Sequence, residues 1–288
     1  MLAETLEQAE RVIVRTEANL PSDARLGAPA QVVEGPLQIG VDLGTAYLVL
    51  VVLNQHGRPI AGEYQFAQVA RDGLVVDFVG AVDRLTAMKD RVQLRLGREL
   101  THAASAFPPG VPQSEVRATA NVVQAAGMEC SGLVDEPTAA NALIGIRDGV
   151  IVDVGGGTTG IAILRDGRVV YTADEPTGGT HFSLVIAGSH DISFEAAETM
   201  KLDPSQQARL FPIIRPVMEK VASIVRRHLD TYRAESGHDV EQLVLVGGTA
   251  RFPGIAGVVQ EYTGIATSVP ERPLFVTPIG IALNDSPV

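Results

Sequence analysis

The chain has 288 residues, of which 45% are hydrophobic and 20% are charged, and this composition excludes a disordered protein and allows two packed domains. The formal net charge of −11 argues against nucleic acid or an anionic membrane surface as a partner, because both are negatively charged. A single cysteine, Cys130, excludes an intramolecular disulfide framework and a thiolate zinc cluster, and since the sequence shows neither a bilayer-spanning apolar run nor a signal peptide, we expect a cytoplasmic protein.

Residues 1–36 are predicted to form an amphipathic arm and a linker. Leu2, Leu6, Ala9 and Ile13 recur at helical spacing with charged residues opposite them, and a turn-rich stretch follows. A helix of this kind either docks into a groove on a partner protein or folds back onto the chain's own first lobe. The sequence leaves both alternatives open.

Residues 37–149 are predicted to form a first α/β lobe. Apolar strands at 37–44 and 47–53 are followed by a hairpin or third strand within 57–73. Helices at 77–100, 112–126 and 136–147 then alternate with strands at 104–107 and 128–134. The change from a strand meander to alternating strands and helices is typical of an α/β domain.

A second lobe is predicted at 150–275, followed by a connecting helix and tail at 276–288. Its first strands, "VIVDVGGGTTGIAIL", repeat the order of "IGVDLGTAYLVLVV" in the first lobe: apolar strand, aspartate, glycine, threonine, apolar strand. Asp-Gly at 166–167 predicts a hairpin turn, and helices are expected at 178–189, 192–201 and 204–235. This similarity between the halves indicates an internal duplication.

The glycine run Gly155–Gly157 directly follows an apolar strand that carries Asp153. Neighbouring backbone N–H groups without side chains form a concave site that suits phosphate oxygens, and an aspartate beside them can hold a divalent cation through water. The plain alternative is a glycine-rich hairpin turn.

Five motifs in this chain resemble, in order, those of the actin-like ATPase superfamily. "IGVDLGTAY" and "VDVGGGTTG" resemble its two phosphate motifs, "VGGTARFPGI" its adenosine motif, and "LVDEPTAANALIG" and "TPIGIAL" its connecting motifs. The motifs are most similar to those of the nucleotide-binding domain of seventy-kilodalton heat-shock chaperones. The resemblance implies two duplicated α/β lobes around a nucleotide cleft, with no separate peptide-binding domain.

The resemblance implies that the chain binds ATP or ADP with Mg²⁺. Asp42 and Asp153 would hold the cation, through water, and Glu136 would orient the attacking water; the alternative for Glu136 is an acid in the first turn of a helix. The phosphates would face residues of three glycine-containing loops, which are Gly44, Thr45, Tyr47, Gly155, Gly156, Gly157, Thr158, Gly178, Gly179 and Thr180. The last three residues could instead cap the helix that follows them.

For the nucleoside, the resemblance implies contacts from a second set of residues. Gly247, Gly248 and Thr249 belong to the adenosine motif, whose glycines let the purine approach bare backbone, and Arg251 would pack on the base. Glu198 and Lys201 would contact the ribose and flank the adenine. The alternatives are a surface arginine at 251 and a solvated ion pair between Glu198 and Lys201.

Two departures from the chaperone pattern predict slow hydrolysis. Ala46 stands where the family has a second threonine, which removes a hydroxyl from the phosphate loop. The family's peripheral lysine is also missing, since Lys89 falls inside the helix predicted at 77–100; Arg71 is the candidate substitute.

Two further segments, "VARDGLVVDF" and "GGTHFSLVIAGSHDISFEAAE", resemble a chaperone-like family of the bacterial ethanolamine-utilisation microcompartment. This implies a nucleotide-switched factor that assists ethanolamine ammonia-lyase or other microcompartment proteins, which an N-terminal docking helix would suit. Alternatives are an actin-like scaffold that self-associates with nucleotide and, ranked last, a small-molecule kinase with Asp77 or Asp83 as its catalytic base. The six histidines show no metal-ligand spacing.

Overall fold

The chain folds into two compact units. The computed structural model describes residues 1–17, 20–24, 26, 34–71, 74–109, 111 and 113–286, without the side chains of 113–115. Unit 1 is Met1–Gly145 together with Phe275–Val288, and unit 2 is Ile146–Leu274. From the sequence we expected residues 1–36 and 276–288 to lie outside the two lobes, as an arm and a tail. In the structure the described parts of both segments belong to unit 1.

Unit 1 contains, within its described residues, a six-stranded sheet and a short two-stranded one. The strands are β1 (Ile13–Thr16), β2 (Gln38–Leu43), β3 (Tyr47–Leu53), β4 (Pro59–Phe66), β5 (Ala70–Arg71), β6 (Leu74–Val75), β7 (His102–Phe107) and β8 (Glu129–Asp135). The large sheet has the order β1-β4-β3-β2-β7-β8, in which β2, β3 and β4 form an antiparallel meander and β7 runs parallel to β2. β5 pairs with β6.

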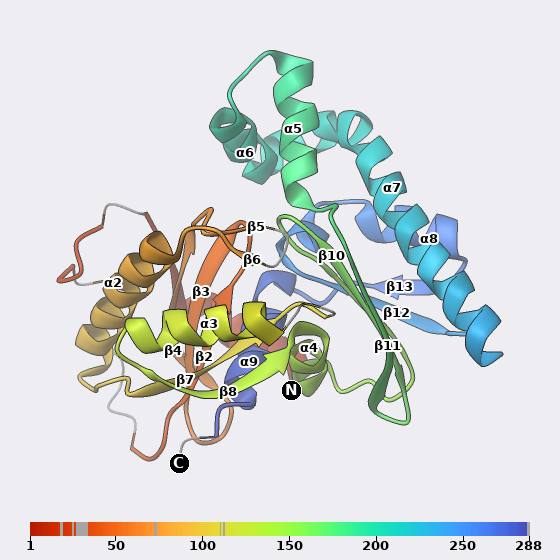
Figure 1. The fold of residues 1–288 in the computed structure, drawn as a ribbon. Coiled ribbons are helices and arrows are strands. Elements are labelled where there is room, and N and C mark those ends of the chain that lie inside the picture. The colour runs from red at the N-terminus through yellow and green to blue at the C-terminus, as the bar shows by residue number, and fades with distance from the viewer. Residues whose placement is uncertain are drawn as a thin grey trace. The chain divides into compact units, whose positions relative to one another are not determined.

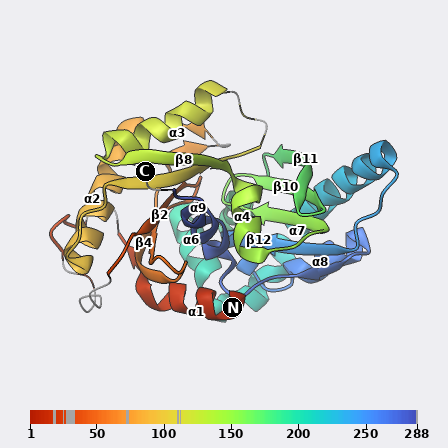
Figure 2. The same cartoon turned by 90° about the horizontal axis from the view of Figure 1, so that it is seen from below.

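Helices cover both faces of the large sheet (Figures 1 and 2). The helices of unit 1 are α1 (Leu2–Val12), α2 (Phe78–Leu96), α3 (Gln113–Ala125), α4 (Glu136–Ile144) and α9 (Val276–Leu283), the last preceded by a 3₁₀ turn η2 (Pro273–Phe275). Because neighbouring strand residues point to opposite faces, Ile39 and Val41 enter the core shared with α2, while Gly40 lies against the backbone of α9. α4 packs on α9 on that second face.

The N-terminal arm folds back onto unit 1. Leu6 and Ala9 are fully buried, and α1 contacts β4. The expected helical stripe ends one position early, because Ile13 starts β1, which pairs in parallel with β4. The described arm thus adopts the second of the two alternatives left by the sequence.

Arginines of α2 hold this arm by its backbone. Arg95 donates to the Val12 carbonyl at 2.6 Å, and Arg91 donates to the Leu20 carbonyl at 2.9 Å. Arg91 is buried and also forms a 2.8 Å ion pair with buried Glu63 of β4. Burial raises the pKa of Glu63, and the guanidinium of Arg91 opposes that rise. The ion pair therefore links the arm to the centre of the unit.

Unit 2 repeats the sheet of unit 1. Its strands are β9 (Gly149–Val154), β10 (Thr159–Arg165), β11 (Arg168–Glu175), β12 (Gln242–Val246) and β13 (Ala266–Ser268). Their order, β11-β10-β9-β12-β13, matches β4-β3-β2-β7-β8 strand for strand, with an antiparallel meander followed by parallel additions. This correspondence confirms the duplication predicted from the sequence.

The helices of unit 2 pack around a single large core within the described residues. They are α5 (Gly179–His190), α6 (Phe194–Leu202), α7 (Pro204–Ser236), α8 (Ile255–Thr263) and the 3₁₀ turn η1 (Gly248–Arg251). α7 begins after the N-cap Asp203 and continues through Pro212 and Pro216. The predicted hairpin turn between β10 and β11 is present, with positive φ at Asp166 and Gly167.

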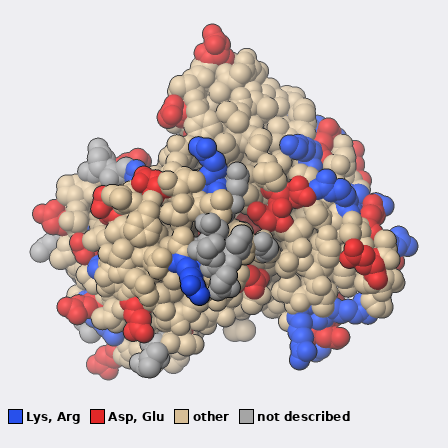
Figure 3. Space-filling model, viewed as in Figure 1, with Lys and Arg blue, Asp and Glu red and all other residues tan. Residues whose placement is uncertain are grey.

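Charges of both signs are interspersed over the face shown in Figure 3. Surface ion pairs of unit 2 include Arg226 with Asp230 at 2.9 Å and Arg233 with Asp239 at 3.0 Å. None of the helices in the described ranges has the length and apolarity needed to cross a membrane.

Candidate functional site

The centre of the candidate site is the turn between β9 and β10. Gly155 N–H donates to the Thr158 carbonyl at 3.0 Å, which closes the turn. The Gly155 carbonyl accepts from Gly179 N–H at 2.9 Å, and the Gly156 carbonyl accepts from Thr180 N–H at 2.7 Å. Within the described chain no hydrogen bond is recorded for the N–H groups of Gly156, Gly157 and Thr158. Three consecutive donors on a bare backbone can therefore bind an anion such as a phosphate.

The loop Gly178–Thr180, for which the sequence left phosphate binding and helix capping open, forms the start of α5. Gly178 is the N-cap of α5, and its N–H donates to Nδ1 of His181 at 3.3 Å. The N–H groups of Gly179 and Thr180 donate to the glycine turn, as given above. All three N–H groups are occupied within unit 2, so this loop caps α5 and supports the Gly155–Thr158 turn.

Asp153 lies beside this turn, at the penultimate position of β9. Gly247 has a φ of 87°, and a Cβ added there would overlap Oδ1 of Asp153 and the Val154 carbonyl. Only glycine satisfies both the backbone angle and the close approach. The carboxylate is thus fixed against the backbone that leads into η1.

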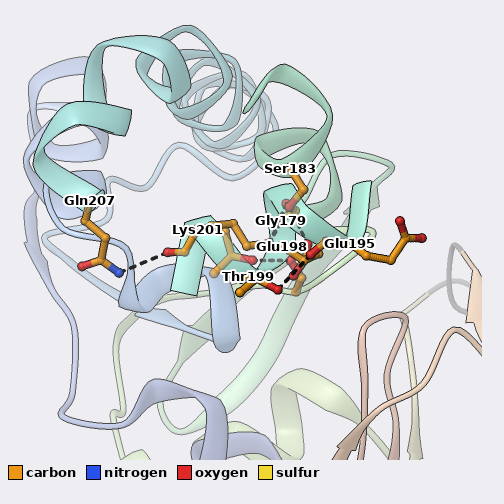
Figure 4. A network of polar contacts seen from close by, with 9 residues as sticks. Gly179, Ser183, Glu195, Glu198, Thr199, Lys201 and Gln207 are labelled. Atoms are coloured by element: carbon orange, nitrogen blue, oxygen red, sulfur yellow. Dashed lines mark hydrogen bonds and ion pairs between the residues drawn. The ribbon is translucent and has the colours of Figure 1, made fainter. Parts of the chain in front are cut away.

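Lys201 closes a buried network between α5 and α6 (Figure 4). Its Nζ donates to Glu198 Oε1 at 2.6 Å, to Ser183 Oγ at 2.9 Å and to the Gly179 carbonyl at 3.0 Å, so its three N–H groups have three acceptors. Ser183 in turn donates to Glu198. Burial lowers the pKa of Lys201, and the negative charge of Glu198 opposes this shift.

The pair formed by Glu198 and Lys201 is therefore not a solvated surface pair. Their side chains are 11% and 14% exposed, respectively. Sequence reasoning did not single out Ser183 or His181. The spacing of Ser183, four residues after Gly179 on one helix, was the available signal.

The adenosine motif forms the turn η1, which follows β12. Thr249 donates its hydroxyl to the Gly155 carbonyl at 2.7 Å, which joins this turn to the glycine turn. Gly247 N–H donates to the Pro273 carbonyl at 3.1 Å. The side chain of Arg251 is exposed, and Gly248 is half-buried.

The remaining predicted residues belong to unit 1. Asp42 is the penultimate residue of β2, as Asp153 is of β9, and Gly44 and Thr45 lie in the turn before β3. The ring of Tyr47 packs against Tyr64 and Phe66, with centroid distances of 5.7 and 5.8 Å. Tyr47 thus helps to fix the start of β3.

Glu136 is the first residue of α4. Asp135 is the N-cap of that helix and accepts from Thr138 N–H at 3.0 Å, and Pro137 follows Glu136 in the first turn. Glu136 is half-buried in the first turn of α4, and Asp135 occupies the N-cap position. Its position is that of an acid in the first turn of a helix, which is the alternative that the sequence also offered for it.

Two further side chains have defined structural roles. Asp77, a candidate base for the kinase alternative, is the N-cap of α2 and accepts from Gly80 N–H at 2.9 Å. Lys89 lies inside α2 and donates to the Ala126 carbonyl at 2.7 Å, at the C-terminal end of α3. Among the residues that the structure describes, no group of three or more His, Cys, Asp or Glu side chains could hold a metal ion.

Known proteins are similar to this chain in both sequence and fold. The ethanolamine utilization protein EutJ of Escherichia coli K12 is 42% identical over 250 residues, covering 86% of this chain and 86% of that protein. The chain belongs to the EutJ family. The crystal structure of EutJ from Carboxydothermus hydrogenoformans has a TM-score of 0.85 and 42% identity, and the match covers 98% of both chains.

The EutJ family has the actin-like ATPase fold, as the motifs predicted. "Type IV pilus assembly protein PilM" matches residues 140–276 and "MreB/Mbl protein" matches residues 57–189. MreB5 of Spiroplasma citri, solved bound to ADP, has a TM-score of 0.68 at 20% identity and covers 86% of this chain and 95% of its own. The chaperone protein HscA homolog of Chromobacterium violaceum is 27% identical over 75% of this chain, which spans only 42% of HscA.

Proposed function

We propose that this EutJ-family protein binds ATP or ADP with Mg²⁺ and hydrolyses ATP slowly. The observation that carries this proposal is the turn Gly155–Thr158, whose three N–H donors lie next to Asp153 and to the η1 turn. MreB 5 of Spiroplasma citri, which has the same fold, has been solved with ADP and with AMPPNP. Bare backbone donors beside a carboxylate suit the phosphates and the hydrated cation of a magnesium nucleotide.

In this proposal the residues of unit 2 have separate tasks, and those of the glycine turn act through their backbone N–H groups. Gly156, Gly157 and Thr158 donate to phosphate oxygens, and Asp153 accepts from water bound to Mg²⁺. Glu198 accepts from the ribose hydroxyls through an oxygen other than Oε1, which already accepts from Lys201 and Ser183. Lys201 and Arg251 flank the adenine, and Gly247 and Gly248 lie against it.

Unit 1 supplies the remaining groups in the proposal. Asp42 accepts from a second cation-bound water, and Gly44 and Thr45 face the phosphates. Glu136 orients the attacking water, a task that a half-buried carboxylate can perform. The magnesium ion, when bound, neutralises charge that develops on the phosphates.

We further propose that nucleotide turnover switches a chaperone-like activity toward ethanolamine ammonia-lyase or other microcompartment proteins in the cytoplasm. The EutJ relatives support the ethanolamine context, and the HscA relative supports a chaperone-like switch. ATP and ADP differ in their contacts with the glycine turn, so hydrolysis can change the relative free energies of two conformations of the protein.

An actin-like scaffold is the second candidate, favoured by the fold shared with MreB. Light scattering with ATP separates the two candidates. Nucleotide-dependent growth of the scattering signal supports a scaffold, whereas an unchanged signal with nucleotide bound supports the switch.

Isothermal titration with ADP and Mg²⁺ tests the proposal. We expect micromolar binding and a raised melting temperature, because a ligand that binds only the native state stabilises it. Lys201→Met should weaken binding, whereas Lys220→Met, which changes an exposed lysine of α7, should not. Absence of heat and of a thermal shift with millimolar nucleotide would contradict nucleotide binding. An ATPase assay with and without ethanolamine ammonia-lyase then tests the switch.

A further inference from the structure

We propose that Thr249 is a positioning residue that orients the phosphate-binding turn through the Gly155 carbonyl. The inference rests on the proposed nucleotide function, and it gives Thr249 a role in positioning the phosphate donors in place of a contact with the nucleoside. Thr249 belongs to the adenosine motif, where a contact with the nucleoside is expected. In the structure its hydroxyl instead donates to the Gly155 carbonyl at 2.7 Å.

The Gly155 carbonyl joins three segments of unit 2. It accepts from the Thr249 hydroxyl of η1 and from Gly179 N–H, the first residue of α5, at 2.9 Å. A carbonyl oxygen has two lone pairs, so these two donors complete its hydrogen bonding. Both hydrogen bonds orient the Gly155 carbonyl oxygen toward η1 and α5.

The direction of this carbonyl fixes the direction of a phosphate donor. The Gly155 carbonyl and the Gly156 N–H belong to one planar peptide unit, and in a trans peptide these two groups point in opposite directions. Glycine has no side chain to restrict rotation of this unit, so the unit would otherwise sample several orientations. Thr249 and Gly179 therefore hold the Gly156 N–H pointing away from η1 and α5, where no acceptor among the described residues is recorded for it.

The next peptide unit is held in the same way. The Gly156 carbonyl accepts from Thr180 N–H at 2.7 Å, which directs the Gly157 N–H outward as well. Only one of the three bonds that set this arrangement comes from a side chain, namely that of Thr249. It is therefore the bond that a substitution can remove without changing the backbone.

The Thr249 hydroxyl packs closely against Gly179. A Cβ added at Gly179 would overlap the Thr249 hydroxyl oxygen. Gly179→Ala should therefore displace the hydroxyl without altering Thr249. This gives a second, independent way to break the same bond.

The test compares ADP with adenosine, which lacks phosphate, by isothermal titration. Thr249→Val keeps the shape of the side chain and removes the hydroxyl; we expect about 3- to 10-fold weaker ADP binding, the effect of one misplaced hydrogen bond. Adenosine affinity should stay within about 2-fold, because the nucleoside does not use the Gly156 donor. Thr249→Ser should restore ADP binding, and Gly179→Ala should reproduce the phosphate-selective loss.

Thr231→Val is the matched control, since the hydroxyl of Thr231 donates to the Arg227 carbonyl within α7. Thermal unfolding of each variant checks that it is folded, and Thr249→Ala removes the same hydroxyl if the valine variant does not fold. Equal loss of ADP and adenosine affinity would show that Thr249 contacts the nucleoside, and unchanged ADP affinity would show that its bond is dispensable; either result overturns the inference. Absence of ADP binding by the unmodified protein overturns the proposed function itself.

Discussion

The carboxylate of Asp285 accepts a hydrogen bond from the backbone N–H of Ile39 at 2.7 Å, across 246 positions of the chain. Ile39 lies in β2, one residue before the described pairing of β2 with β7 begins at Gly40. The same carboxylate accepts from the Ser131 hydroxyl and lies 3.1 Å from Nε2 of His102. The tail after α9 thus supplies a partner for a backbone donor of the central sheet.

Asp285→Asn is expected to lower the free energy of unfolding by about 1–3 kcal/mol, the usual effect of leaving a buried polar group unsatisfied. An asparagine amide has one acceptor oxygen, so its NH₂ group would face one of the donors that the carboxylate now satisfies. Urea denaturation measures the change. Asp239→Asn, at an exposed ion pair with Arg233, should change stability by less than about 0.5 kcal/mol. Equal effects of the two substitutions would contradict the role of Asp285.

The arm should behave as a part of unit 1. Leu6→Ala removes a fully buried side chain and should cost about 2–5 kcal/mol of stability, whereas Leu94→Ala, at a leucine that is 55% exposed, should cost less than about 0.5 kcal/mol. Deletion of residues 1–16 should lower the melting temperature sharply. An unchanged melting temperature after that deletion would favour the alternative in which the arm docks on a partner.

Glu175 should give unit 2 a pH-dependent contribution to stability. A hydrogen bond with His228, at 2.9 Å, lowers the pKa of Glu175. Burial raises this pKa in part, and the positive charge of Arg227 lowers it further. A carboxyl group whose pKa is lower in the folded protein stabilises the fold at any pH above its ordinary pKa of 4.5. This stabilisation is lost as the pH falls below 4.5 and through the lowered pKa.

Glu175→Gln should therefore cost about 1 kcal/mol near neutral pH and progressively less in acid. Urea denaturation at a series of pH values measures the difference between the unmodified protein and the variant. Glu219→Gln, at a half-buried pair with Arg215 on α7, is the control. A difference for Glu175→Gln that stays constant from neutral pH down to strong acid would contradict this account.

Glu136→Ala should slow ATP turnover by at least about 10-fold and change nucleotide affinity by only about a few-fold, because the carboxylate is proposed to orient water and not to bind phosphate. Asp153→Asn should instead weaken binding of the magnesium nucleotide. Glu195→Ala, which removes a first-turn acid from α6, is the matched control. Turnover equal to that of the unmodified protein would show that Glu136 serves only the start of α4.

The duplicated sheets could be predicted from sequence because their signals are local. Each half presents an apolar strand, an aspartate in the penultimate position, a turn and a second apolar strand, and Asp42 and Asp153 occupy equivalent places in β2 and β9. Helix ends were also visible, since Asp77, Asp203 and Gly237 provide capping signals near the observed limits of α2 and α7.

The parts that were missed depend on contacts distant in sequence. Ile13 continues the helical stripe of α1, and only its pairing with Gly62 of β4 makes it a strand residue. The sequence left phosphate binding and helix capping open for the loop Gly178–Thr180, and only the tertiary fold shows that the carbonyls of Gly155 and Gly156 accept from two of its backbone donors. Residue type shows that a donor exists, whereas its acceptor is set by the tertiary fold.

The division of unit 1 between the two ends of the chain sets the order in which the protein can fold during synthesis. Unit 2 is one continuous segment, Ile146–Leu274, and it leaves the ribosome before α9 and Asp285 do. Domains usually fold from the N-terminus as they emerge. Here the first 145 residues are translated before α9, so the face of the large sheet that α9 covers stays open until α9 has been translated.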